Sequence, residues 1–325
     1  ARCAQEDRGG RSWSPGEARF VLTELHVVYG ASGGIGNAVI REHATQGFDV
    51  RGVNRSGQAL VPSGVDVVAA DAARIDDVRR SMQGASVVYQ CLFPVEQDSI
   101  IDVAAETGAK LVVASNLYMY DPTLGPMSED SPHSLGNRQS ARFYEEMNEQ
   151  ALEAHRSGRV RAAVGQASDI YGPNVRHGIG GDLVFGPLAA GKPASFLGDL
   201  DAVHTYTYAD DCARALVTLG QHDEALGQSW HVPSADPITS RQLFDVIFTE
   251  LGQEPKIRSA NGMLLNMLAL FSPDMKRLKR EKVYQFTTPW LVDSSKYEQA
   301  FGRDVTPHEE AVRQTVAWFE AHPPA

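Results

Sequence analysis

The stretch that most constrains this chain spans residues 25–36, where a short apolar run leads directly into closely spaced glycines. The run 25–29 is rich in β-branched residues, and a helical pattern opens after it. A strand that turns sharply into a helix exposes free backbone N–H groups and the positive end of the helix dipole. Such a turn suits a pyrophosphate, so we predict a dinucleotide-binding loop. Its residues are Gly30, Ser32, Gly33, Gly34, Ile35 and Gly36.

Length and charge narrow the class of protein. The 325 residues carry a net charge of −11 and no run of Lys and Arg, which argues against a nucleic-acid surface. Three scattered cysteines suit a reducing cytoplasm, and the ten histidines lack metal-site spacing, so we expect no metal. No window reaches the roughly 18 apolar residues of a membrane span. Residues 1–20 are polar and are expected to form a flexible leader.

Short apolar segments alternate with amphipathic ones from residue 25 to about 165. Strands are expected at 25–29, 49–53, 65–69, 86–90, 110–114 and 160–165, and helices near 35–46, 75–83, 97–107 and 139–156. This alternation predicts an α/β Rossmann fold with a doubly wound parallel sheet. We expect a cofactor domain over 21–175 and a smaller, mainly substrate-binding lobe over 176–325. Segments near 203–220 are expected to return to the first domain.

Residues that follow the strands are the candidate ligands, because such sheets bind ligands at the carboxyl ends of their strands. Arg55, after Asn54, suits the 2′-phosphate of NADP, whereas NAD would favour an acidic residue there. Asp71 is either an acceptor for the adenine amino group or an ordinary helix N-cap. Cys91 is expected beside the cofactor ribose as a small packing residue.

The segment after the fifth strand, 113–121, resembles the Ser-Ser-x-x-x-Tyr-Gly motif of the extended short-chain dehydrogenases/reductases. Tyr171-Gly172-Pro173, the stretch 205–213 and the stretch 306–318 resemble further motifs of this superfamily in the same order. The resemblance thus covers about residues 24–321. It implies that Ser115 or Asn116 polarises the substrate, that Tyr120 matches the motif's aromatic residue, and that Tyr171 leads the chain over the nicotinamide. It also implies a homodimer.

The chain departs from this superfamily on the helix after the fifth strand. The superfamily carries Tyr-x-x-x-Lys there, an acid/base tyrosine with a lysine that lowers its pKa and holds the ribose. The motif should begin near Ser140 or Ala141, and no such pair is present. Tyr144, one turn further on, is the first candidate for a replacement acid, and Tyr120 or Tyr118 the second. Arg138 or Arg142 could replace the lysine's charge, but not act as an acid. The chain resembles the atypical, epimerase/dehydratase-like members.

In the C-terminal half, 263–271 and 283–286 are apolar and are expected to form a wall or lid, with a basic helix between them. These basic residues could serve a diphosphate, although a solvated face is the simpler interpretation. Asp210 and Asp211 are expected to cap a helix. His204 is expected to have a structural role or to point at the substrate.

We therefore expect a cytoplasmic NAD(P)-dependent oxidoreductase, using NADP or alternatively NAD. It would transfer hydride to or from a carbonyl or activated double bond of a small, fairly apolar molecule. The predicted catalytic residues are Ser115, Asn116, Tyr144 and Tyr120. One alternative is a nucleotide-sugar epimerase or dehydratase. Another is a sensor or scaffold that binds NADP(H) without turnover.

Overall fold

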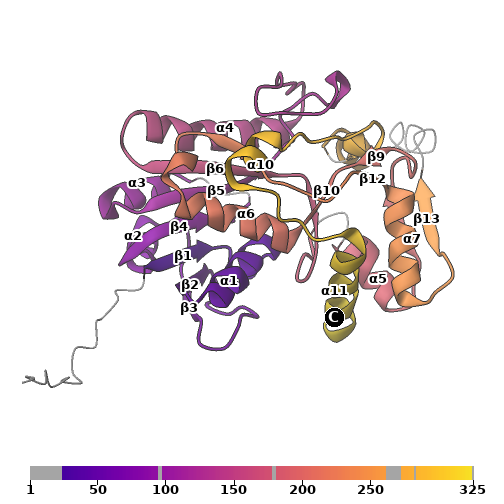
Figure 1. The fold of residues 1–325 in the computed structure, drawn as a ribbon, viewed down its shortest axis with the longest axis horizontal. Helices are drawn as coiled ribbons and strands as arrows, with labels where there is room; N and C mark the ends of the chain where they lie inside the picture. Colours follow the sequence, from indigo (N-terminus) through magenta and orange to yellow (C-terminus); the bar gives the residue numbers. More distant parts are fainter. Residues whose placement is uncertain (1–23, 94–96, 178–180, 261–271, 282, 324–325) are drawn as a thin grey trace, which may run out of the picture.

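A computed structural model describes residues 24–93, 97–177, 181–260, 272–281 and 283–323 (Figure 1). The expected leader at 1–20 and the expected apolar wall at 263–271 lie outside the described residues.

A seven-stranded, wholly parallel sheet forms the centre of the molecule, in the order β11-β6-β5-β4-β1-β2-β3. Its strands are β1 (Leu25–Tyr29), β2 (Asp49–Asn54), β3 (Asp66–Ala69), β4 (Ala85–Gln90), β5 (Lys110–Asn116), β6 (Arg161–Ala167) and β11 (Ser229–His231). The chain runs outward from β1 to β3 and then returns to build β4 on the other side of β1. The switch point therefore lies between β1 and β4, which is where such sheets bind ligands.

Helices cover both faces of the sheet. One face carries α1 (Gly34–Gln46) and α6 (Ala209–Gln221). The other carries α2 (Ile75–Ser81), α3 (Asp98–Thr107) and α4 (Gln139–Arg156). Each face buries its own apolar layer because successive side chains of a strand point to opposite sides. The predicted doubly wound fold is confirmed, and the expected strands and helices lie within two residues of the observed ones.

A smaller lobe lies beside the sheet, on the right in Figure 1, around a largely aromatic core that includes Phe185, Phe196, Phe244 and Phe319. Its elements are the π-helix η2 (Gly181–Phe185), α5 (Gly186–Ala189), β8 (Ala194–Leu197), α7 (Ser240–Leu251), β13 (Ile257–Ala260), α9 (Pro273–Glu281), η4 (Val283–Phe286) and α11 (His308–Ala321). The remaining short elements are η1 (Pro122–Leu124), β7 (Asp169–Tyr171), β9 (Val203–His204), β10 (Tyr206–Tyr208), η3 (Asp223–Ala225), β12 (Ile238–Thr239) and α10 (Ser295–Phe301). The domain boundaries expected from the sequence stay predictions.

The expectation that Asp210 and Asp211 cap α6 is wrong, since Tyr208 is the N-cap and makes no side-chain cap bond. Both carboxylates instead have tertiary partners. Asp210 pairs with Arg41 on α1. Asp211 is buried and accepts hydrogen bonds from the N–H (2.9 Å) and hydroxyl (2.7 Å) of Thr306. The pair therefore ties α6 to α1 and to the C-terminal segment.

No described helix is both long and apolar enough to cross a membrane. In the same described part of the chain, no group of His, Cys, Asp and Glu side chains is arranged to hold a metal ion.

Two histidines are buried together beneath α1. His43 is fully buried and donates through Nδ1 to the carbonyl of Val39 (2.8 Å), which leaves Nε2 as an acceptor. His26, 1% exposed, donates from Nδ1 to that nitrogen at 2.8 Å. Burial lowers the pKa of His26 to about 3 and that of His43 to about 4. Both rings are therefore neutral in the folded protein.

This pair predicts a loss of stability in mild acid. The folded pKa values lie below the ordinary 6.5, so only the unfolded chain takes up these protons as the pH falls from about 6.5 toward 4. Each histidine should cost about 2 kcal/mol of unfolding free energy between pH 7 and pH 5. Urea unfolding at both pH values should show a clearly smaller loss in His26→Leu/His43→Leu than in the wild type. An exposed-site control, His222→Gln, should keep the wild-type loss, and an equal loss in all three proteins would contradict this account.

Candidate active site

The glycine-rich loop is held tightly against the ends of β1 and β4. Gly30 has a φ of +91°, and a Cβ on it would lie 2.5 Å from the carbonyl oxygen of Cys91. A Cβ on Gly36 would overlap the carbonyl oxygen of Gly30. Side chains at these two positions would push α1 away from β1, so the close approach requires glycine.

The N-terminus of α1 is open to a ligand. Its N-cap, Gly33, has no side chain to cap the first turn, and no described group accepts from the N–H of Gly34, Ile35 or Gly36. Ser32 and Gly33 are exposed at the tip of the loop. Uncapped N–H groups at the positive end of a helix suit an anion, so these residues fit the pyrophosphate of a dinucleotide.

The segment after β7 covers one side of this loop. Asn174, at φ +63°, donates from Nδ2 to the carbonyl of Ser32 at 3.1 Å. A Cβ on Gly34 would lie 2.6 Å from the side chain of Val175. The side chain of Tyr171 points elsewhere: it is buried, stacks on Phe185, and its hydroxyl lies 3.1 Å from Nδ1 of His308. The segment that begins with Tyr171-Gly172-Pro173 thus contacts the glycine-rich loop through Asn174. The sequence analysis did not name Asn174 as a candidate ligand.

The candidate adenosine ligands lie after β2 and β3. The Asn54 side chain shapes its own loop, accepting from the Gly57 N–H (2.7 Å) and donating to the Gln58 carbonyl (2.8 Å). Arg55 is exposed, without a hydrogen-bond or ion-pair partner among the described residues. Asp71 is not a helix N-cap, because α2 is capped at Arg74; its carboxylate accepts from the Ala73 N–H at 3.1 Å.

Cys91 lies directly after β4 with its side chain buried. Burial raises the pKa of the thiol far above its ordinary value, so the thiol stays protonated and unreactive. Its carbonyl oxygen is the group that faces Gly30.

Two predicted residues, Asn116 and Tyr144, lie beside each other at the end of β5, and a third, Ser115, is buried directly before Asn116. Ser115 is 2% exposed, and its Oγ has no hydrogen-bond partner in the described structure. Asn116 accepts the Tyr118 N–H through Oδ1 at 3.0 Å, and its side chain lies beside the hydroxyl of Tyr144 on α4. Burial raises the pKa of Tyr144 to about 12, while the neighbouring Asn116 side chain acts to lower it.

Tyr120 does not join this group. It is 3% exposed, donates to Oε1 of Gln166 at 3.1 Å, and lies between the rings of His133 and His231. Tyr118 instead lies edge-to-face with Tyr144, with ring centroids 5.7 Å apart. The structure therefore brings together Asn116, Tyr144 and Tyr118, with Ser115 buried in β5 directly before Asn116, and leaves Tyr120 apart.

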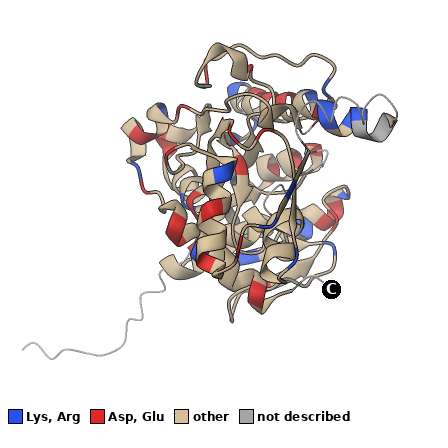
Figure 2. Cartoon of the chain, turned by 90° about the vertical axis from the view of Figure 1, so that its right-hand side faces the viewer, with Lys and Arg blue, Asp and Glu red and all other residues tan. Residues whose placement is uncertain are grey.

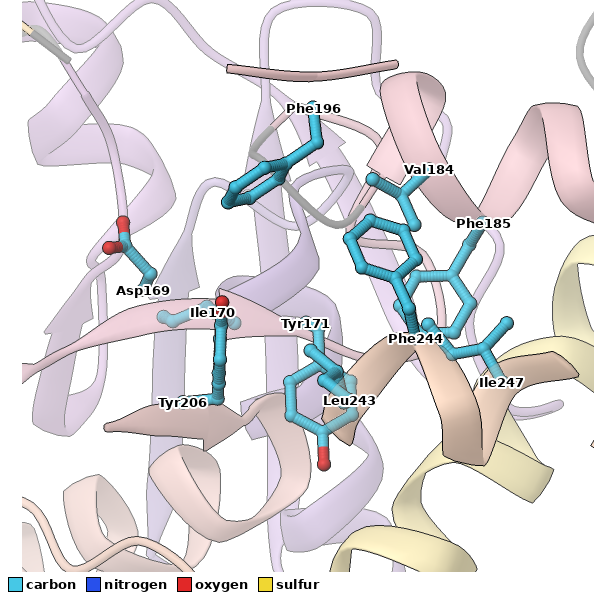
Figure 3. Close-up of a pocket in the computed structure, with 10 residues that line it drawn as sticks. All are labelled: Asp169, Ile170, Tyr171, Val184, Phe185, Phe196, Tyr206, Leu243, Phe244 and Ile247. Carbon is cyan, nitrogen blue, oxygen red and sulfur yellow. The ribbon is translucent and has the colours of Figure 1, made fainter. Parts of the chain in front are cut away.

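The Tyr118 hydroxyl leads into a buried polar network. It donates to Asp169 at 3.2 Å, and the other oxygen of that carboxylate lies 2.9 Å from Nε2 of His204. His204 is 1% exposed and stacks on Phe286, so its position agrees with the structural role. Asp169 also borders an apolar pocket of the smaller lobe, shown in Figure 3. The pocket is lined by Asp169, Ile170, Tyr171, Val184, Phe185, Phe196, Tyr206, Leu243, Phe244 and Ile247.

The expected basic helix is α9 (Figure 2). Lys276 and Arg277 are exposed on it, whereas Arg280 pairs with Glu281 at 2.9 Å. Glu281 in turn accepts from the N–H of Ser140 (3.1 Å) at the start of α4. Thus α9 is anchored to the helix that carries Tyr144.

The structure also shows a residue that counting along the sequence missed. Counting from Pro132 places the acid/base pair near Ser140, but the tyrosine beside Asn116 is Tyr144. The fourth residue after it is Asn148, which is 8% exposed. Which residues of α4 face β5 depends on the rotation of the helix about its axis, and the sequence does not give that rotation. The structure is therefore needed to identify Tyr144 and Asn148.

The geometry of the glycine-rich loop predicts that alanine substitutions at Gly33 and Gly36 have different effects on stability and on dinucleotide affinity. Gly36→Ala should destabilise the fold, because its Cβ overlaps the backbone of Gly30. Gly33→Ala should keep near-wild-type thermal stability, because its Cβ would be 3.4 Å from the nearest atom. That Cβ would stand where a pyrophosphate approaches, so we expect dinucleotide affinity to fall by about tenfold or more. Melting curves and fluorescence titrations separate the two effects. Wild-type affinity in Gly33→Ala would contradict the proposed loop contact.

Comparison with known proteins agrees with this geometry. The model of the NAD dependent epimerase/dehydratase family matches residues 26–232. Among solved structures, UDP-glucose 4-epimerase of Thermus thermophilus, complexed with NAD, superposes with a TM-score of 0.74 at 17% identity, covering 92% of this chain and 99% of that one. The dTDP-glucose 4,6-dehydratase of Bacillus anthracis, also in complex with NAD, gives a TM-score of 0.73 at 14% identity, covering 92% and 97%.

The dTDP-glucose 4,6-dehydratase DesIV of Streptomyces venezuelae, with NAD and TYD bound, gives a TM-score of 0.73 at 16% identity and covers 92% of this chain and 97% of that chain. No curated protein matches the sequence. At these identities the structural matches establish the fold, and the family model, which spans more than half of the chain, establishes the family. The resemblance drawn from the motifs is thereby confirmed: the chain belongs to the NAD dependent epimerase/dehydratase family.

Proposed function

We propose that the chain is an atypical NAD(P)-dependent oxidoreductase of this family that transfers hydride to or from a carbonyl or an activated double bond. The observation that carries the proposal is the position of Tyr144 beside Asn116 at the end of β5, where its ring lies edge-to-face with that of Tyr118. This position supports a proton donor at the carboxyl edge of the sheet, next to the strands that hold the glycine-rich loop. A bound nicotinamide would supply or accept the hydride.

The chain's own residues then divide the work of cofactor binding. The open N-terminus of α1 binds the pyrophosphate through Gly34, Ile35 and Gly36. Arg55, exposed and unpartnered among the described residues, binds a 2′-phosphate, which favours NADP over NAD. In this proposal Asp71 accepts from the adenine amino group and Cys91 packs beside the ribose, as expected from the sequence. Tyr171 supports the loop only indirectly, because its own side chain is buried in the smaller lobe.

Proton transfer falls to Tyr144. The amide of Asn116 beside Tyr144 acts to lower the tyrosine's pKa, and the O–H of Tyr144 is the proton donor to the substrate oxygen in this proposal. The same amide stabilises the phenolate that forms when the proton leaves. Ser115, whose hydroxyl has no partner among the described residues, is the remaining donor for a developing oxyanion. Asn116 thus performs part of the task that a lysine performs in the ordinary short-chain dehydrogenases/reductases.

The surroundings of Tyr144 favour a fairly apolar substrate. Partly exposed aromatic rings surround it: Phe93 at 5.4 Å, Phe143 at 5.2 Å and Tyr118 at 5.7 Å between centroids. Flat apolar molecules pack well against such rings.

The second candidate is nucleotide-sugar epimerisation or dehydration, which the family favours. The exposed Lys276 and Arg277 of α9 could hold a diphosphate. Against it stands the lack of a lysine four residues after Tyr144, where the chain has Asn148, since burial raises the pKa of Tyr144 to about 12 and a lysine's charge would lower it. The third alternative is a protein that binds NADP(H) without turnover. The same high pKa agrees with it, because a tyrosine that holds its proton firmly transfers it slowly.

The expected homodimer stays a prediction, and the described surface adds one observation. Exposed large apolar side chains are Leu60, Ile75, Leu124, Leu183 and Leu278, none of them on α3 or α4. The outer side of α4 instead carries exposed Glu146, Glu149 and Glu153. Glu149 and Glu153 both pair with Arg156 of the same helix.

Replacing Tyr144 tests the proposed function. We expect wild-type protein to oxidise NADPH with members of a panel of apolar ketones, aldehydes and enones. Tyr144→Phe should lower kcat by about 100-fold or more, with unchanged NADPH affinity, because it removes only the transferable proton. Tyr120→Phe is the matched control and should keep most of the activity. Wild-type activity in Tyr144→Phe would refute its role, and wild-type protein that binds NADPH but turns over no carbonyl would favour the sensor.

A further inference from the structure

The loop that carries Arg55 is tied to α1 by a buried side chain. Asn37 lies on α1, directly after the last glycine of the glycine-rich loop. Its amide Nδ2 donates to the backbone carbonyl of Leu60 at 2.6 Å, across 23 positions of the chain. Asn54 shapes the same loop from within, but its hydrogen bonds reach only as far as Gln58. The bond from Asn37 therefore attaches the loop to the helix whose N-terminus is proposed to bind the pyrophosphate.

The amide of Asn37 is held in this orientation from its other side. Its Oδ1 accepts from Arg41, one turn further along α1, and the same guanidinium pairs with Asp210 on α6. Only the oxygen of an amide can accept from a guanidinium, so the NH2 group faces Leu60. Asn37 is 3% exposed, so water competes little for this NH2 group, and the hydrogen bond is stronger than it would be in solvent.

The contact at Leu60 is made by the backbone. The Leu60 side chain is 58% exposed, so its burial adds little to holding the loop. The neighbouring Ala59 and Val61 are partly buried against the core, but apolar contacts have no preferred direction. A hydrogen bond to a carbonyl does have one. The bond from Asn37 therefore sets how the loop stands relative to α1.

The position of this loop matters for Arg55, whose side chain is exposed and has no hydrogen-bond or ion-pair partner among the described residues. An exposed arginine loses rotamer freedom when it binds a ligand. Fixing its backbone in advance lowers the remaining cost of ordering it. Of the two dinucleotides, only NADP(H) brings a phosphate to the ribose 2′-oxygen, so a fixed loop should favour NADP(H) selectively.

We propose that Asn37 is a positioning residue for cofactor selection. Through the carbonyl of Leu60 it holds the loop 54–61 where Arg55 meets the 2′-phosphate of NADP(H). The inference rests on the proposed function, since it requires Arg55 to bind that phosphate. Asn37 acts through Arg55 and not on the dinucleotide itself, so NADH, which lacks the phosphate, gains nothing from the bond to Leu60.

A double-mutant cycle with Arg55 tests this indirect role. Asn37→Ala removes the amide. Titration of the full chain, followed by nicotinamide fluorescence, should show about tenfold weaker NADPH binding, with NADH binding changed by less than about twofold. In an Arg55→Ala background the same replacement should change neither affinity by more than about twofold, because the residue it acts through is gone. Asn137→Ala, the same replacement at an exposed position, should leave both affinities at the wild-type value.

A second variant covers the case in which Asn37→Ala does not fold. The hydroxyl of Asn37→Ser can still accept from a donor but is too short to reach Leu60, so it should give the same selective loss. Unchanged NADPH affinity, or equal losses for NADPH and NADH, would overturn the inference. Losses that persist in the Arg55→Ala background would overturn it too. If the wild type did not bind NADPH, or if Arg55→Ala left the ratio of NADPH to NADH affinity unchanged, the cofactor assignment of the proposed function would itself be wrong, and the inference with it.

Discussion

The close approach of α1 to β1 is the contact on which the rest of the site depends. It exists because Gly30 and Gly36 carry no Cβ, so the first turn of α1 starts directly at the strand end. That turn has no cap of its own, which leaves several N–H groups and the positive end of the helix dipole for an anion. Asn174 and Val175 then fix the loop from the side of β7.

The proposed reactive centre uses a different pair of elements, the end of β5 and α4. Asn116 lies beside Tyr144, and burial of the tyrosine strengthens the effect of a neighbouring polar group, because electrostatic interactions are stronger in a poorly solvated place. Burial raises the pKa of Tyr144 to about 12, so the tyrosine is protonated at neutral pH and holds a proton that it can donate.

Much of the fold is predictable from the sequence because parallel strands buried on both faces are continuous apolar runs, and the helices between them are amphipathic. The glycine-rich loop is equally predictable, since its close backbone contacts require residues without a side chain. The partners of individual side chains cannot be predicted in this way. Asp210 and Asp211 have the pattern of a helix cap, yet Arg41 and Thr306, distant in sequence, bind them. The helix α4 shows the same limit, because its rotation relative to β5 depends on the path of the loop 117–138, which no local pattern predicts. The sequence alone therefore leaves Tyr144 as one of several candidates and does not point to Asn148.

The most direct measurement is the titration of purified wild-type protein and of Arg55→Asp with NADPH and NADH, followed by nicotinamide fluorescence. The open α1 terminus predicts saturable binding to one site, and Arg55 predicts that NADPH binds more tightly than NADH to the wild type. The variant should lose NADPH affinity selectively. If the wild type bound NADPH and NADH with equal affinity, and Arg55→Asp changed neither affinity, Arg55 would not be a cofactor ligand. If neither dinucleotide bound, the proposal that the open N-terminus of α1 binds a dinucleotide would be wrong.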